Sequence, residues 1–204
     1  ARDQWVCEGT PPPPSQFPRV KDGTLVQSSQ KSTGFPQIPG VNYTTLYNRQ
    51  LFLDYGPNLA QGKIEIHPPK QIKNGEYKIL VTKVDKDGND VAGIRLPAVE
   101  VPIATYTGWN LWIEGLAENE LCGLFGSYIP FARTKTERLA SGDRRLSLAE
   151  RYKNHADYVN KTSQAARALV EQRYLLPEDA ERIIEEARKN PVFVGGNSGG
   201  TEVY

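Results

Sequence analysis

The 204-residue chain lacks methionine altogether and contains only two histidines and two cysteines. It has no apolar run of about 18 residues, which predicts that no helix crosses a membrane, and no charged-then-apolar signal peptide opens it. Zinc motifs such as Cys-x-x-Cys and His-Glu-x-x-His are absent, so the sequence assigns no metal site. Cys7 and Cys122 lie far apart; Cys122 sits in an apolar run, which favours a buried free thiol, although a disulfide stays open.

The chain also lacks an excess of positive or negative charge. The 25 basic and 24 acidic residues give a formal net charge of +1, so no long-range field favours nucleic acid or an anionic membrane. Hydrophobic residues make up 38% of the chain and charged residues 24%, which is typical of a folded chain of one domain or two small ones. No nucleic-acid partner, membrane span or cofactor is therefore expected.

The first residues predict the end of a helix. The absence of methionine and the start at Ala1 lead us to expect a piece of a longer protein. In residues 1–10, Trp5 and Val6 supply an apolar face and Gly9 offers a helix stop, so we expect the last turns of a truncated core helix. The compartment stays undetermined.

Residues 11–75 are rich in proline and glycine and predict an irregular segment that wraps around another part of the protein. Pro11–Pro14 favour an extended polyproline conformation, which suits a stiff linker or, alternatively, a ligand for a proline-recognising domain. Residues 21–26 predict a turn and a short strand.

Residues 76–112 carry the clearest strand pattern and predict a small antiparallel β unit. Residues 77–85 form one expected strand, Asp87-Gly88 the tip of a hairpin, and residues 91–97 the return strand. The acidic turn superficially resembles a calcium loop, but its glycine stands at the fourth place rather than the sixth. The hairpin is therefore the favoured interpretation.

Residues 113–190 predict a helical region and residues 191–204 a flexible tail. Ser147 and Glu150 form a capping box, and a helix that buries Tyr152 and Val159 follows. A last helix begins at Pro177 and closes with basic residues. The fold class is therefore α+β, with an irregular N-terminal wrap, a small antiparallel β unit and two to three C-terminal helices.

Catalytic patterns are weak. His155 and Asp157 are two residues apart on a helix and point to different sides, so His155 is expected to be a solvated histidine; His67 ends an extended segment. Ser198 matches the pattern Gly-x-Ser-x-Gly, but no helix can follow it before the chain ends. Gly123 and Gly126 are expected to let the neighbouring apolar side chains pack in a tight turn rather than to bind phosphate.

Three aromatic residues around Gly108 have two interpretations. Tyr106, Trp109 and Trp112 could be packed in a core, or they could form an aromatic rim over a substrate cleft. The basic residues that follow, among them Arg144 and Arg145, are expected to be a solvated approach to the capped helix.

Long ordered segments carry a family resemblance. Residues 5–26, 34–41, 87–111 and 120–152, the last with the sequence ELCGLFGSYIPFARTKTERLASGDRRLSLAERY, resemble the C-terminal part of a bacterial family of alpha/beta hydrolase domain proteins. The resemblance implies a serine-hydrolase-like parent that hydrolyses an ester or related acyl substrate. In the Ser, acid, His order of such enzymes, all three catalytic residues would precede Ala1, so no catalytic residue is carried over.

The resemblance implies a C-terminal part of a larger α/β-hydrolase-like protein, inactive alone, that packs beside an upstream catalytic domain and shapes its cleft for a small ester-like substrate. The alternative is a non-catalytic accessory module that binds a protein or glycan through its aromatic strand.

Overall fold

The computed structural model describes residues 2–193, and within them three separate two-stranded antiparallel sheets are combined with helices. This mixed arrangement confirms the expected α+β class, although three small antiparallel sheets occur in the described residues where one small β unit was expected. Ser198 and residues 194–204 of the predicted flexible tail lie outside the described residues.

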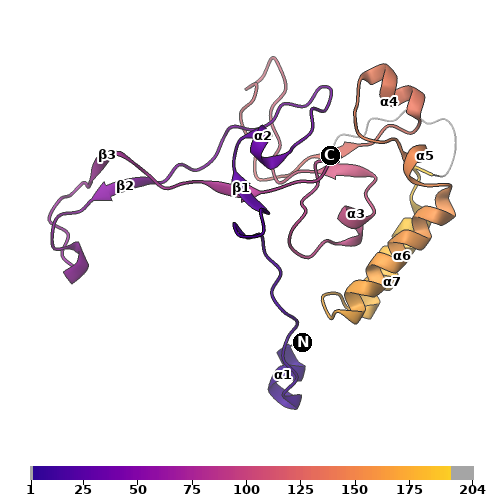
Figure 1. Ribbon diagram of the computed structural model, residues 1–204, viewed down its shortest axis with the longest axis horizontal. Coiled ribbons are helices and arrows are strands. Elements are labelled where there is room, and N and C mark those ends of the chain that lie inside the picture. Colours follow the sequence, from indigo (N-terminus) through magenta and orange to yellow (C-terminus); the bar gives the residue numbers. More distant parts are fainter. Residues whose placement is uncertain (1, 194–204) are drawn as a thin grey trace.

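Helix α1 (Arg2–Glu8) ends at Gly9, whose φ of 70° is the left-handed conformation that glycine adopts readily. The predicted stop at Gly9 is thus observed, whereas the end of a truncated core helix stays a prediction. None of its residues is buried, and Trp5 is 56% exposed. Figure 1 shows α1 apart from the main body, joined to it by the proline-rich segment. Arg173 holds this segment by donating to the carbonyl oxygen of Pro11 at 2.9 Å.

One sheet, which we call the central sheet, pairs two strands whose pairing the sequence did not predict. Strand β1 (Leu25–Gln27) pairs with β4 (Leu80–Thr82), and the short helix α2 (Gln30–Thr33) follows β1. The predicted return strand over residues 91–97 does not form; a single bridge between Val84 and Asp90 is all that remains of the hairpin. The reason is that the intervening turn is drawn into the interior, where Asp87 and Asn89 are buried.

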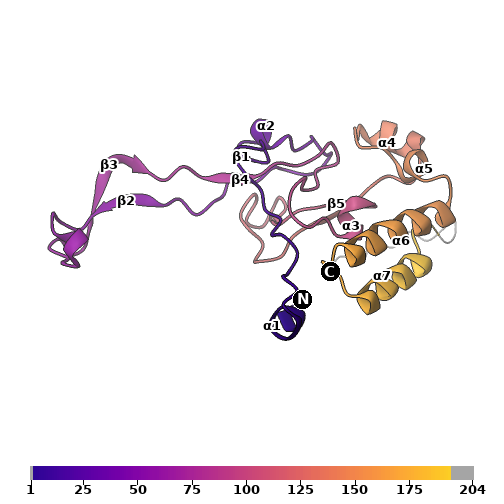
Figure 2. The same ribbon diagram turned by 60° about the horizontal axis from the view of Figure 1, so that its bottom comes forward.

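Strands also occur inside the segment that was expected to be irregular. Strands β2 (Leu51–Asp54) and β3 (Lys70–Glu76) pair through an irregular register, and the 3-10 helix η1 (Leu59–Gln61) lies between them. Figure 2 shows this hairpin projecting from the body as an arm. We refer to residues 51–76 as the arm. Strand β2 has only four residues, β3 contains Gly75, and prolines lie between the two strands, which hides them from a periodicity argument.

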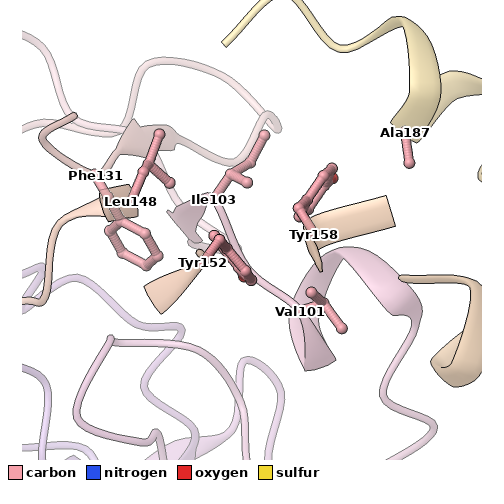
Figure 3. Packing of buried hydrophobic residues seen from close by; sticks show 7 residues of the cluster. All are labelled: Val101, Ile103, Phe131, Leu148, Tyr152, Tyr158 and Ala187. Atoms are coloured by element: carbon pink, nitrogen blue, oxygen red, sulfur yellow. The ribbon is translucent and has the colours of Figure 1, made fainter. Parts of the chain in front are cut away.

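The main core lies where the third sheet meets the C-terminal helices. Strand β5 (Ala104–Tyr106) pairs with β6 (Tyr128–Pro130), and helix α3 (Pro97–Glu100) precedes β5. Figure 3 shows the buried cluster that joins them. Its members are Val101, Ile103, Phe131, Leu148, Tyr152, Tyr158 and Ala187.

The C-terminal helices are α4 (Lys135–Ser141), α5 (Leu148–Arg151), α6 (His155–Glu171) and α7 (Pro177–Lys189). The capping box of Ser147 and Glu150 is confirmed, as is the start at Pro177. The chain does not continue from α5 into one long helix, because Asn154 caps a new helix by accepting from the Asp157 N–H at 2.9 Å. Tyr152 is nevertheless buried.

Several expectations about burial are wrong. Leu124 and Phe125 are exposed, because the turn at Gly123 projects them outward rather than packing them. Cys122 is a free thiol but only half-buried, and Cys7 is free and exposed. Arg145 is buried, at 4% exposure, while its neighbour Arg144 is exposed. Of the helices within residues 2–193, none has the length and apolar character required to cross a membrane.

Candidate functional site

An aromatic pocket of about 460 Å³ lies between the central sheet and the loops around Gly108. This volume falls in the range of small-molecule sites, about 300–1,000 Å³. Residues far apart in the chain line it, mostly with apolar and aromatic side chains. They are Thr33, Phe35, Tyr43, Thr44, Leu46, Tyr47, Val81, Thr82, Val84, Gly88, Asp90, Tyr106, Thr107, Gly108, Trp109, Leu121, Gly123 and Leu124.

The structure brings two of the three predicted rim residues together. Tyr106 and Trp109 both line the pocket and are half-buried, so Trp109 packs against the interior and faces the pocket as well. Trp112 is not among the lining residues and is 40% exposed on the adjoining loop. The two interpretations of Trp109 are therefore compatible.

Three inclined rings build one wall of the pocket. The ring centroid of Trp109 lies 5.6 Å from that of Phe35 and 5.8 Å from that of Tyr43, while Phe35 and Tyr43 are 5.4 Å apart. Inclined and edge-to-face arrangements at these distances are favourable, because the positive edge of one ring meets the negative face of another. Sequence reasoning missed Phe35 and Tyr43, which lie in a proline-rich loop without periodicity.

Asn89 fixes the strand that carries Tyr106. The Asn89 side chain is fully buried; its Nδ2 donates to the Ala104 carbonyl oxygen at 3.0 Å, and its Oδ1 accepts from the Tyr106 N–H at 2.8 Å. Both backbone groups are thereby satisfied where water is excluded. The turn beside the pocket is thus bonded directly to β5.

Gly88 allows the close approach of this turn. Its φ is 84°, and a Cβ atom there would lie 2.8 Å from Thr105 Cγ2 and 3.2 Å from Phe35 Cε2. A side chain would therefore be strained and would collide with the pocket wall. The sequence indicated a turn at this glycine, but it carried no signal of the burial.

Buried ion pairs hold the turn and the strand that lie next to the pocket. Asp87 accepts two hydrogen bonds from the Arg151 guanidinium, one of them at 2.8 Å. Arg145 donates to Asp143 at 2.7 Å and to the Thr105 hydroxyl at 2.8 Å. Burial alone would raise the pKa of Asp143, but the hydrogen bonds from Arg145 outweigh it and lower that pKa. Sequence reasoning missed this network because Arg145 was expected to face solvent and Arg151 was not singled out.

Tyr106, one of the lining residues, carries a neutral phenol. Burial raises the pKa of Tyr106 well above its usual value, and the nearby Tyr128 and Tyr158 raise it further. Its ring lies 5.6 Å from the ring of Tyr128. The phenol therefore stays protonated at neutral pH and presents an O–H rather than a phenolate.

Neither histidine belongs to a triad within residues 2–193. His67 is exposed in the arm. His155 is not the solvated histidine that was expected: it is half-buried, its Nε2 lies 2.9 Å from the Ala187 carbonyl oxygen, and its ring stacks on Phe193 at 5.4 Å. The start of α6 packs against the end of α7, which turns this ring inward. No group of three potential metal ligands occurs in the described part of the chain.

Comparison with known families gives one assignment. The family model for the alpha/beta hydrolase domain matches residues 1–185. No curated protein and no solved structure matches the chain.

Proposed function

Because the chain belongs to the alpha/beta hydrolase domain family, we propose that it is the C-terminal region of a serine hydrolase and forms one wall of the substrate cleft. The catalytic serine, acid and histidine belong to an upstream domain. The reaction is hydrolysis of an ester or related acyl bond: the serine oxygen takes the acyl group, the alcohol leaves with a proton, and water releases the acid.

The observation that carries the proposal is the aromatic pocket. Tyr106 and Trp109 line it, and a pocket of this size accepts one group of a small substrate. Trp112 is exposed on the adjoining loop, and we assign it to the outer rim of the pocket. Such walls act by binding and orientation, so their removal is expected to change KM and substrate preference more than the chemical step.

A fluorophosphonate probe tests the class of reaction. The longer protein is expected to be labelled at a serine upstream of Ala1, and the 204-residue chain is expected to remain unlabelled. Absence of labelling in the longer protein would contradict a serine hydrolase. Labelling of Ser198 in this chain would contradict the upstream position of the nucleophile.

Trp109→Ala tests the pocket. In the longer protein we expect kcat/KM for a series of esters to fall by about tenfold or more, mainly through KM, because an aromatic contact surface is lost. Trp109→Phe, which keeps a ring, is expected to retain most of the activity. Trp5→Ala is the matched control, since Trp5 is exposed on α1 outside the pocket. Unchanged kinetics in a folded Trp109→Ala variant would rule out a role in substrate binding.

The second candidate is a non-catalytic module that binds a protein or glycan. The arm favours it, because Phe52, Leu53 and Ile72 are exposed on a hairpin that leaves both strand edges open among the described residues. This candidate predicts no fluorophosphonate labelling in any form of the protein.

A further inference from the structure

The aromatic pocket has an unusual balance of chemistry. Within residues 2–193, five of its lining residues are aromatic, and Asp90 is the one with a formal charge. The five are Phe35, Tyr43, Tyr47, Tyr106 and Trp109. Over the same residues, no lysine, arginine or histidine contributes to the lining. A lining of aromatic side chains with one carboxylate favours a ligand that carries positive charge.

The Asp90 carboxylate is available to such a ligand. Its Oδ1 accepts from the Thr82 hydroxyl at 2.6 Å, and the side chain forms no ion pair with any of the residues that the structure describes. The hydroxyl orients the carboxylate without neutralising it. A cation in the pocket would therefore find an uncompensated negative charge.

The nearest guanidinium does not cancel this charge. Arg95 donates to the backbone carbonyl oxygen of Asp90 at 2.8 Å, but its positive charge is shared by Asp85 at 3.3 Å and Glu100 at 2.7 Å. Asp85 and Glu100 thus share the Arg95 guanidinium, which forms no ion pair with Asp90 in the part of the chain that the structure describes. Lys83, which lies between two lining residues, is exposed and is not part of the lining.

We propose that this pocket binds an alkylated ammonium group, quaternary or protonated tertiary, carried by a small ester. Aromatic faces attract such cations through their quadrupoles, and alkylation reduces the hydration that a primary ammonium would have to lose. As a statement about substrate, the proposal rests on the hydrolase function proposed above. The pocket volume of about 460 Å³ exceeds what a trimethylammonium group fills and leaves room for the adjoining part of the ester.

A pair of isosteric probes tests the charge. Choline and 3,3-dimethyl-1-butanol have the same shape, with a quaternary nitrogen in one and a carbon in the other. Calorimetric titration of the full-length protein at low salt is expected to show choline binding about tenfold or more tightly than the alcohol. Equal affinities would overturn the proposal, as would the absence of saturation by either probe up to about 10 mM.

Two variants locate the binding. Asp90→Asn is expected to reduce the selectivity for choline several-fold and to leave the affinity for the alcohol unaffected, because the aromatic rings keep part of the attraction for the cation. Tyr43→Leu, which keeps an apolar wall but removes a ring face, is expected to reduce choline selectivity several-fold. Asp3→Asn on α1 is the matched control and should change neither affinity. Unaltered choline binding in a folded Asp90→Asn variant would overturn the proposal.

The titration needs no turnover, so it separates this proposal from the hydrolase function. Choline binding without fluorophosphonate labelling would uphold the cation site and reject the serine hydrolase. Fluorophosphonate labelling without selectivity for choline would uphold the serine hydrolase and reject the cation site. If both hold, the acetate ester of choline is expected to have a kcat/KM about tenfold above that of 3,3-dimethylbutyl acetate, and Asp90→Asn should reduce this preference several-fold.

Discussion

Adjacent arginines in one basic segment have opposite environments. Arg144 is exposed, whereas the Arg145 guanidinium is buried and donates to Asp143, to Thr105 and to the carbonyl oxygens of Ile129 and Pro130. It therefore joins β5, β6 and the loop before α5. A run of basic residues carries no local sign of which member is turned inward.

At the residue scale, Arg145→Ala is expected to lower the free energy of unfolding by about 3–5 kcal/mol. The reason is that Asp143 would remain buried without its charged partner. Urea unfolding followed by circular dichroism measures the change. Arg144→Ala is the neighbouring control and is expected to stay within about 0.5 kcal/mol of the parent. Similar losses in both variants would contradict the buried role of Arg145.

At the element scale, Glu150 joins two helices. Its carboxylate completes the capping box of α5 by accepting from the Ser147 N–H at 3.0 Å, and it accepts from Arg138 of α4 at 2.6 Å. The hydrogen bonds from Arg138, followed by those from Ser147, hold the pKa of Glu150 far below its usual value. The stabilisation is complete above the unfolded-state pKa of about 4.5 and decreases as the pH falls below it.

In the parent, the unfolded chain takes up a proton at Glu150 between about pH 4.5 and pH 2, whereas the folded chain does not. Glu150→Gln removes this difference, so the variant is expected to lose less stability over the same pH range. Urea midpoints across a pH series measure the slope. Glu181→Gln, on the exposed surface of α7, should leave it unchanged. An unaltered slope in Glu150→Gln would show that this carboxylate does not contribute to acid unfolding.

At the scale of the whole molecule, the arm is an appendage of the folded body. Figures 1 and 2 show it extending away from the other elements. Phe52 packs against Tyr77 at its base, with ring centroids 4.4 Å apart, and Arg49 pairs with Glu76 at 2.5 Å. Isolated two-stranded hairpins are marginally stable in water, so the arm contributes little to the body.

Removal of residues 51–76 tests this view. The Tyr77 N–H donates to the Gln50 carbonyl oxygen at 2.9 Å, so an Asn-Gly turn can join these two residues. We expect the shortened chain to unfold within about 1 kcal/mol of the parent, because no core residue is lost. A loss greater than about 2 kcal/mol would show that the arm supports the body.

Sequence reasoning succeeded where structure depends on near neighbours. The stop at Gly9, the capping box of Ser147 and Glu150, and the start at Pro177 follow from contacts within one turn of a helix. The same reasoning failed for the return strand at residues 91–97 and for the solvated histidine at 155. In both cases a distant segment offered better partners than the local chain.

The candidate site divides in the same way. Tyr106 and Trp109 were predicted as rim residues from their clustering around Gly108, and both line the pocket. Phe35, Tyr43 and Asp90 were not predicted as part of it. They come from other loops. Their positions depend on the tertiary fold, which the hydrophobic periodicity of the sequence does not indicate.

By itself, the sequence determined the near-neutral charge, the helix ends and, through long ordered segments, the resemblance to the alpha/beta hydrolase domain family. Only the tertiary structure decided that Phe35, Tyr43, Asp90 and Trp109 share one pocket, and that Arg145 rather than Arg144 is buried. The physical reason is that caps and turns are satisfied within a few residues. Pockets and buried ion pairs instead require chain segments that meet only when the whole core has formed.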